Sequence, residues 1–326
     1  MKHLVSLVSS YEKDLFVIKW RITRLCNLHC SYCVQVKNRT QFSQAAVQKE
    51  TETLLKAAPD ISAMMDRLSM KKVKLEFVGG EMSLFDLKKI LSLITSKKLK
   101  RVQLTTNFTR NEEYYISLAH YLRQRNIELT ITCSFHYEFM SMDTYFSKAL
   151  AVKSSCTIFA CEMVSNEDNQ VLCKEFRKRC EELKLDYSID EDIRMEKAGL
   201  RKEGKLLGCG QHIKKNPRYI AVFSEEGKEY ETVYKTRNDF VTDGSFFENF
   251  RNKIIKTNGF ICTQSWDYVY IEVDNAIGRT KTSKDCCNRM KITDFVQIPP
   301  CECIKNGCTL CGQMSLLPKK QGVSVN

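Results

Sequence analysis

The sequence lacks the long apolar segments that would place the chain in a membrane or direct it for secretion. No run of 18 apolar residues occurs, so no membrane span is predicted. The apolar stretch within residues 1–10 is too short for a secretory signal. Internal repeats and low-complexity tracts are missing as well. We therefore expect a cytoplasmic protein whose 326 residues form one large domain, or a domain of about 200 residues with a smaller appendage.

Patterns typical of nucleic-acid binding are also absent: there is no aromatic-interleaved basic stripe, zinc finger or RNA-binding signature. The formal net charge is nevertheless +12. The lysines and arginines of the chain stand in short clusters such as Lys71, Lys72 and Lys74. This pattern favours a solvated basic surface. An acidic partner, either a peptide segment or a nucleic acid, is the alternative. Nucleic acid remains the minor expectation.

Cysteine, by contrast, is abundant. Sixteen cysteines without a signal peptide argue against a disulfide scaffold and for a reducing compartment in which thiolates bind metals. Cys26, Cys30 and Cys33 have the spacing C-x3-C-x2-C and follow an apolar, β-branched segment. Such thiolates hold iron–sulfur clusters, and three of them leave one iron of a four-iron cluster open. Zinc, with His29 as a further ligand, and plain thiols are the alternatives.

Short β-rich runs alternate with helical patterns from residue 15 to about residue 195, which predicts a parallel α/β domain. The first helix, 44–69, is expected to be interrupted at Pro59. Ser83 is expected to cap the second helix. Six strands are predicted, at Phe16–Thr23, Val73–Val78, Val102–Thr105, Glu128–Cys133, Cys156–Val164 and Leu185–Ile193.

Polar or glycine-bearing turns follow these strands, at the ends where parallel barrels place their chemistry. The two glycines of Gly79-Gly80-Glu81 would let the backbone approach a ligand closely. A plain turn, or strand capping by small polar side chains, is the alternative for each motif. The polar residues at the next three strand ends are Thr106 and Asn107, then Ser134 and His136, then Glu162.

The cysteine triad, the aromatic residue before its third cysteine (Tyr32) and the Gly79-Gly80-Glu81 turn together resemble the radical S-adenosylmethionine (SAM) superfamily. The family has proline after Gly-Gly-Glu, where this chain has Met82. The resemblance implies a partial (β/α)6 TIM-type barrel over residues 1–200, with a [4Fe–4S] cluster on the triad that chelates SAM. The residues that it assigns to SAM are Tyr32, Gly79, Gly80, Glu81, Thr106, Asn107, Ser134, His136 and Glu162.

Radical chemistry is the activity that this resemblance implies. An electron from the reduced cluster, supplied by a donor such as flavodoxin or ferredoxin, cleaves SAM to a 5′-deoxyadenosyl radical that abstracts a substrate hydrogen atom. The cofactor carries the difficult step and the protein binds, orients and excludes solvent. His136 is a candidate proton donor or acceptor. Cys209, in a glycine-flanked loop, is a candidate hydrogen-atom donor.

The character of the sequence changes after residue 200. Residues 201–260 are expected to form a junction and a hairpin, Arg218–Phe223 with Glu229–Tyr234. Residues 261–326 resemble the SPASM and twitch extensions, which bind auxiliary clusters. Cys262, a strand at 268–273, Gly278 and Cys286 follow the family's order, although seven residues separate the last two where four are usual. The candidate ligands are Cys262, Cys286, Cys287, Cys301, Cys303, Cys308 and Cys311.

One auxiliary [4Fe–4S] cluster is the main expectation for these cysteines, with two clusters or a zinc ribbon as alternatives. The function expected from the resemblance is oxidative modification of a ribosomally made peptide. Dehydrogenation of a small sugar, aminocyclitol or nucleoside is the alternative reaction. A zinc-scaffolded protein that binds nucleic acid is the alternative of another class, although such a scaffold has no need of the Gly79-Gly80-Glu81 turn.

Overall fold

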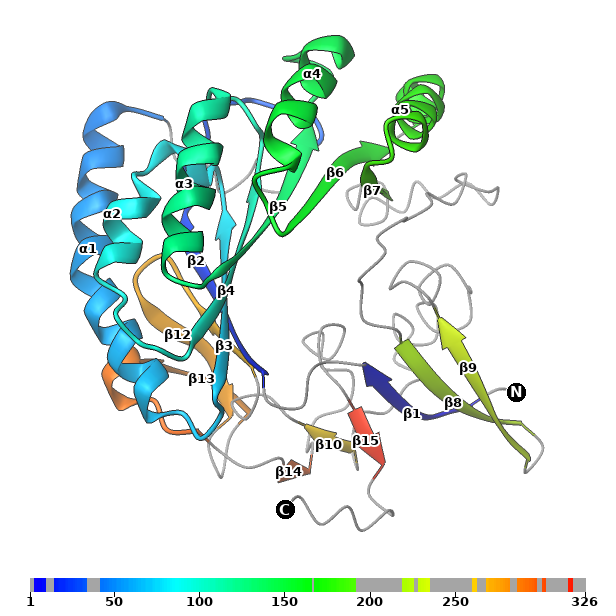
Figure 1. The fold of residues 1–326 in the computed structure, drawn as a ribbon. Helices are drawn as coiled ribbons and strands as arrows, with labels where there is room; N and C mark the ends of the chain where they lie inside the picture. The colour runs from blue at the N-terminus through cyan, green and yellow to red at the C-terminus, as the bar shows by residue number, and fades with distance from the viewer. Residues whose placement is uncertain are drawn as a thin grey trace.

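The structure, a computed structural model, describes a large part of the chain, and the following statements concern that part alone (Figure 1). Its strands form a nine-stranded sheet and a six-stranded sheet. The described residues are 3–9, 15–33, 42–165, 167–191, 219–225, 228–234, 260–262, 268–281, 286–297, 301–302 and 316–318.

The larger sheet has the strand order β13-β12-β11-β2-β3-β4-β5-β6-β7. The strands from β11 to β7 in this order are parallel, so the predicted parallel α/β domain is confirmed. The six predicted strands are β2 (Leu15–Thr23), β3 (Lys72–Gly79), β4 (Leu99–Thr106), β5 (Glu128–Phe135), β6 (Ile158–Ser165) and β7 (Asp186–Glu191).

Helices pack against one face of this sheet (Figure 1). In β5 the side chains of Leu129, Ile131 and Cys133 are buried in the core that the helices cover, whereas Thr130 and Ser134 of the opposite face are partly exposed. The helix-free face of the sheet therefore carries polar side chains. The helices are α1 (Gln44–Arg67), α2 (Leu87–Ser92), α3 (Glu112–Gln124), α4 (Met142–Lys153) and α5 (Gln170–Glu182), with short 3₁₀ turns at Met82–Leu84, Glu167–Asn169 and Ile292–Asp294.

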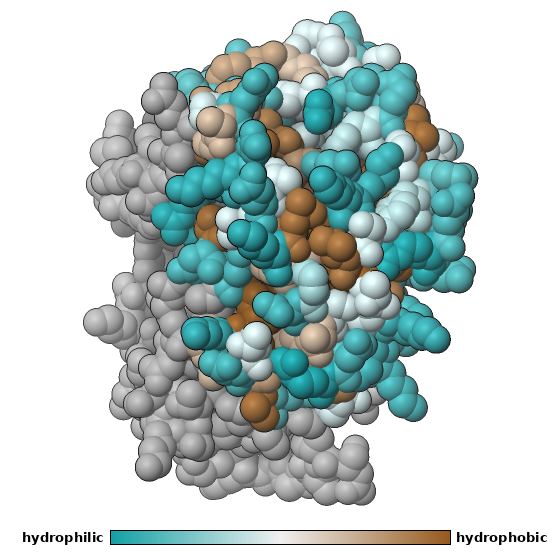
Figure 2. Space-filling view, turned by 90° about the vertical axis from the view of Figure 1, so that its left-hand side faces the viewer, coloured by the Kyte–Doolittle hydropathy of each residue, from teal (hydrophilic) through white to brown (hydrophobic). Residues whose placement is uncertain are grey.

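Two details of the helices correct the sequence analysis. Helix α1 runs without interruption through Pro59, because Pro59 lies on its exposed side, where water can solvate the carbonyl that loses its amide partner. Helix α2 is capped by Asp86, whose Oδ1 accepts a hydrogen bond from the Lys89 amide over 3.1 Å. Ser83, the predicted cap, instead lies within the preceding 3₁₀ turn and is buried. Figure 2 shows the mainly hydrophilic outer surface on the α1 and α2 side.

A segment from the C-terminal part of the chain completes the larger sheet. Strand β11 (Tyr268–Ile271) pairs in parallel with β2, and β12 (Ala276–Lys281) and β13 (Cys286–Lys291) continue the sheet as antiparallel strands. The indole Nε1 of Trp20 donates to Oδ1 of Asn275 over 3.1 Å, which fastens the turn after β11 to the core. Residues 268–281 and 286–291, which the sequence analysis groups with the extension, thus share a sheet with the parallel strands.

The smaller sheet has the order β14-β10-β15-β1-β8-β9. Its strands β8 (Tyr219–Glu225) and β9 (Lys228–Tyr234) are antiparallel neighbours, which confirms the predicted hairpin. Strand β1 (His3–Ser9) pairs with β8 and was not predicted. The others are β10 (Phe260–Cys262), β14 (Cys301–Glu302) and β15 (Leu316–Pro318). Among the described residues, no helix combines the length and the apolar character needed to cross a membrane.

Candidate functional site

The cysteine loop, residues 26–33, follows β2 and brings three free thiols together. Cys30 is buried, and Cys26 and Cys33 are partly exposed around the small apolar cluster that contains Leu28 and Tyr32. The amide of Cys33 donates to the carbonyl of Cys30 over 3.2 Å, which closes a turn between these two cysteines. Burial, followed by the charges of Cys26 and Cys33, raises the pKa of Cys30 to about 12. All three thiols thus belong to, or pack against, one small cluster of side chains.

The glycine turn after β3 lies directly against this loop. A Cβ atom on Gly80 would lie 1.9 Å from the carbonyl oxygen of Leu25, and one on Gly79, whose φ is +136°, would lie 2.1 Å from that of Thr23. The amide of Gly80 donates to Thr23 over 2.9 Å, and the amide of Glu81 donates to Leu25 over 2.8 Å. Glycine is required here because two backbone segments approach too closely for a side chain.

The carboxylate of Glu81 is fully buried and joins the turn after β3 to the end of β4. One oxygen accepts from the Ser83 amide over 2.8 Å and from the Thr106 hydroxyl over 2.6 Å. The other accepts from the Asn107 amide over 2.6 Å. Burial raises the pKa of Glu81, and these donors oppose that rise. Both oxygens thus bind protein groups, which gives the side chain a positioning role.

The side chain of Asn107, at the end of β4, holds the first half of the cysteine loop. Its Nδ2 lies 3.7 Å from the sulfur of Cys26 and donates to Oδ1 of Asn27 over 2.8 Å. Its Oδ1 accepts from the hydroxyl of Thr109 over 2.8 Å, and that hydroxyl also accepts from Nδ2 of Asn27 over 2.9 Å. Asn107 therefore contacts the sulfur of Cys26, a candidate cluster ligand.

His136, at the end of β5, lies against the second half of the loop. Its Nδ1 is 3.2 Å from the sulfur of Cys30 and 3.0 Å from the hydroxyl of Tyr32. Burial lowers the pKa of His136 to about 4, so the imidazole is neutral at pH 7. The ring of Tyr32 stacks with that of His136 and with that of Tyr137, at centroid distances of 5.9 and 5.3 Å.

Ser134 and Glu162 occupy paired positions on β5 and β6 and are partly exposed on the helix-free face. The Ser134 hydroxyl lies 3.5 Å from a Glu162 carboxylate oxygen, at the limit of a hydrogen bond. Their strands β5 and β6 lie beyond β3 and β4 from β2, so the two side chains stand farther along the sheet, where they could meet another part of a ligand.

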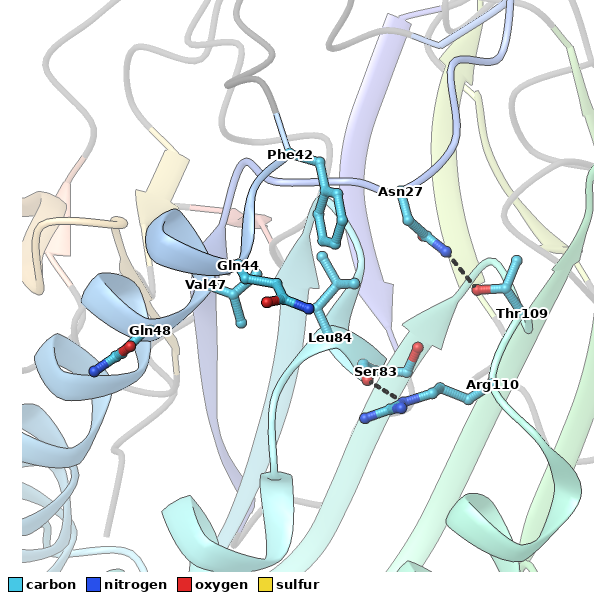
Figure 3. A pocket seen from close by; sticks show the side chains of 9 residues that line it. All are labelled: Asn27, Phe42, Gln44, Val47, Gln48, Ser83, Leu84, Thr109 and Arg110. Atoms are coloured by element: carbon cyan, nitrogen blue, oxygen red, sulfur yellow. Dashed lines mark hydrogen bonds between the residues drawn. The ribbon is translucent and has the colours of Figure 1, made fainter.

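A cavity of about 570 Å³ opens beside the cysteine loop (Figure 3). Asn27 reaches it from the cysteine loop and Thr109 from the segment after β4. Arg110, whose Nε donates to the carbonyl of Ser83 over 3.0 Å, forms another wall. Its size is within the range of small-molecule sites. The lining side chains are Asn27, Phe42, Gln44, Val47, Gln48, Ser83, Leu84, Thr109 and Arg110.

The remaining predicted residues divide into two groups. Cys209, Cys303, Cys308 and Cys311 lie outside the described residues. Cys262, Cys286, Cys287 and Cys301 lie in strands of which the backbone is described, and Cys262 is the Cα partner of Cys301 across β10 and β14.

Sequence reasoning missed several residues that surround the loop, namely Asn27, Thr109, Tyr137 and Glu138. All of them lie within three residues of a predicted site residue. A search of the neighbours of each strand end for polar and aromatic side chains would have found them.

The loop has features that suit an iron–sulfur cluster. Within the described ranges, no three His, Cys, Asp or Glu side chains converge on a position for a single metal ion. A [4Fe–4S] cluster distributes its thiolate ligands over separate irons, so its ligands need not meet at one point. The Leu28 amide and the Asn107 side chain also donate toward the sulfur of Cys26, as donors do around cluster thiolates. The donor set of the loop fits the cluster.

No family model and no curated protein matches this chain. A similar solved structure is coproporphyrinogen III oxidase (HemN) from Escherichia coli, a radical SAM enzyme, with 11% identity and a TM-score of 0.44 over 84% of this chain and 68% of that one. Another is native anSMEcpe with bound AdoMet and peptide, with 15% identity and a TM-score of 0.45 over 86% of this chain and 78% of that one. Similarity at this level does not establish the family.

Proposed function

We propose that this protein is a radical SAM enzyme. The observation that supports this most directly is the placement of three free thiols at the carboxyl end of β2, against the glycine turn of β3 and the polar ends of β4 and β5. In parallel α/β folds, ligands bind at this end of the strands. Cys26, Cys30 and Cys33 would hold a [4Fe–4S] cluster, which with SAM supplies a radical that abstracts hydrogen.

The chain's own residues would position this chemistry. The Gly79-Gly80 turn and Glu81 fix the entry of the loop, and Asn107 and His136 hold its two halves. Polar backbone of the glycine turn would contact SAM, as the resemblance implies. The partly exposed polar side chains of the helix-free face, Ser134 and Glu162 among them, would contact SAM or substrate.

For the substrate, we propose a ribosomally made peptide that is modified oxidatively. The net charge of +12 is compatible with an acidic peptide segment as partner. An auxiliary cluster would accept the substrate electron. The pairing of Cys262 with Cys301 on neighbouring strands supports such a second site, because it places two candidate ligands side by side. A flavodoxin or ferredoxin would deliver the first electron.

The test begins with protein purified and reconstituted without oxygen. Iron and sulfide are counted per chain, and 5′-deoxyadenosine is measured after SAM and a strong reductant are added. About eight irons with 5′-deoxyadenosine would support one auxiliary cluster, and about twelve would support two. Zinc in place of iron, with SAM left intact, would contradict the proposal.

Cysteine variants provide the matched control. Replacing Cys26, Cys30 and Cys33 by Ala should remove about four irons and abolish SAM cleavage while the fold is kept. Cys173→Ala, which changes a buried thiol on α5, should keep the wild-type iron content and the cleavage of SAM. A triad variant that unfolds would favour a zinc-nucleated scaffold instead.

The substrate class is tested with extract fractions that stimulate 5′-deoxyadenosine formation. If the substrate is a peptide, protease treatment of the stimulating fraction should abolish the effect. A protease-resistant small-molecule fraction that keeps its effect would contradict the peptide proposal.

A further inference from the structure

Two three-residue segments contact each other residue by residue at the cysteine loop. Residues 136–138 follow β5, and residues 30–32 form the second half of the loop. Nδ1 of His136 lies 3.2 Å from the sulfur of Cys30 and 3.0 Å from the hydroxyl of Tyr32. The contact is thus centred on a candidate cluster ligand.

The other two residues of the 136–138 segment add independent contacts. The ring of Tyr137 stacks on that of Tyr32 with an interplanar angle of 19°. The carboxylate of Glu138 accepts from the Ser31 amide over 2.9 Å and also from the Ser31 hydroxyl. Every residue from 30 to 32 therefore has a partner in this segment.

The first half of the loop is held differently. Cys26 and Asn27 are contacted by Asn107, from the end of β4. The two halves are consequently attached to two different strand ends.

We infer that residues 136–138 form a clamp that fixes the Cys30–Tyr32 half of the loop and presents the imidazole Nδ1 of His136 to the sulfur of Cys30. The role of this sulfur as a cluster ligand rests on the proposed function. A thiolate ligand only accepts hydrogen bonds, so the tautomer that carries the proton on Nδ1 would donate to it. Such donors stabilise the more negative, reduced cluster and raise its reduction potential.

The clamp itself is tested on cluster-free protein under reducing conditions, by the rate at which iodoacetamide alkylates each cysteine, followed by mass spectrometry. Compared with Glu138→Gln, which removes the same charge but keeps an oxygen acceptor, Glu138→Leu should raise the rate of Cys30 alkylation about tenfold, because the loss of hydrogen bonds favours local opening by about that factor. The rate at Cys26 should be unchanged, since Asn107 holds that half. Equal acceleration at both cysteines, or none at Cys30, would overturn the clamp.

Buried Cys173 serves as the internal reference for global unfolding. If Glu138→Leu also exposes Cys173, the test is repeated with the variant Ser31→Ala. This change removes only the hydroxyl contact with Glu138. The same selective acceleration at Cys30 is expected, by a smaller factor.

The contact with sulfur is tested on reconstituted full-length protein, by the midpoint potential of the cluster from a redox titration followed by electron paramagnetic resonance. His136→Leu should shift the midpoint to a more negative value, and His136→Asn, which keeps an N–H donor near the position of Nδ1, should remain close to wild type. If His136→Leu binds as much iron as the wild type and has the same midpoint potential, the inferred hydrogen bond from His136 to the sulfur of Cys30 is overturned. Failure of the wild type to bind iron would instead refute the proposed function, and the alkylation test would still decide the clamp.

Discussion

The carboxylate of Glu81 accepts a hydrogen bond from the backbone amide of Asn107 over 2.6 Å, and this bond joins the turn after β3 to the end of β4. The same turn donates to the carbonyl of Leu25, directly before the cysteine loop. Three neighbouring strand ends are thereby connected through the side chain and the backbone amide of one buried residue. The geometry of the loop should depend on Glu81 although this side chain touches none of the three cysteines.

Replacing Glu81 by Gln should destabilise the fold. Both carboxylate oxygens accept from backbone amides, so a glutamine NH₂ group would face an N–H donor at one of them. A buried donor without an acceptor costs about 1–3 kcal/mol. The free energy of unfolding, from denaturant titration, is the measurement. Glu52→Gln, on the exposed side of α1, is the matched control and should change it little.

The pH dependence of stability should carry the signature of Glu81. Burial raises its pKa in the folded protein above the ordinary value of 4.5. As the pH rises from about 4.5, the unfolded chain therefore loses a proton that the folded protein keeps. The free energy of unfolding should decrease in this window by up to about 1.4 kcal/mol per pH unit relative to Glu81→Gln. Parallel profiles of the two proteins would show that the pKa is not raised.

Gly80→Ala should displace the cysteine loop. The new Cβ would lie 1.9 Å from the carbonyl oxygen of Leu25, so one of the two segments must move. We expect a lower melting temperature and less iron bound after reconstitution. Val78→Ala, in the preceding strand β3 and partly exposed, lacks this conflict and should bind iron as the wild type does. Wild-type iron content in Gly80→Ala would show that the loop tolerates the shift.

Glycine should have opposite effects at two residues with positive φ. Phe108 has a φ of +60° and Asn126 a φ of +55°, so glycine relieves backbone strain at both. Asn126 is exposed, and Asn126→Gly should stabilise by up to about 1 kcal/mol. Phe108 is fully buried against Tyr115 and Tyr145, and Phe108→Gly should cost at least about 3 kcal/mol. Denaturant unfolding measures both, and equal signs would contradict the explanation.

The attachment of the β11 segment should depend on Asn275. Trp20 is fully buried and donates its indole N–H to this residue over 3.1 Å. Asn275 also has a positive φ of +58°, so glycine keeps the turn while it removes the acceptor. Asn275→Gly should cost about 1–3 kcal/mol, in contrast to Asn126→Gly, which loses no such bond. A stabilised Asn275→Gly protein would show that the indole bond contributes nothing.

The structure also shows where local patterns were insufficient. Pro59 predicted an interruption of α1, but the helix continues because the residue lies on the solvent side. Ser83 is a favourable capping residue, yet Asp86 caps α2, because the chain first makes a 3₁₀ turn that buries Ser83. Propensity states what a residue can do, and burial decides whether it does so.

The order of strands and helices from residue 15 to residue 191 was determined by the sequence itself, since apolar periodicity and turn residues are local properties. The cysteine spacing likewise located the loop. Tertiary structure alone decided which distant segments meet: Cys30 with His136, 106 positions apart, and Trp20 with Asn275, 255 positions apart. These contacts depend on strand order and register in the folded sheet, which the packing of all strands sets together and no local pattern encodes.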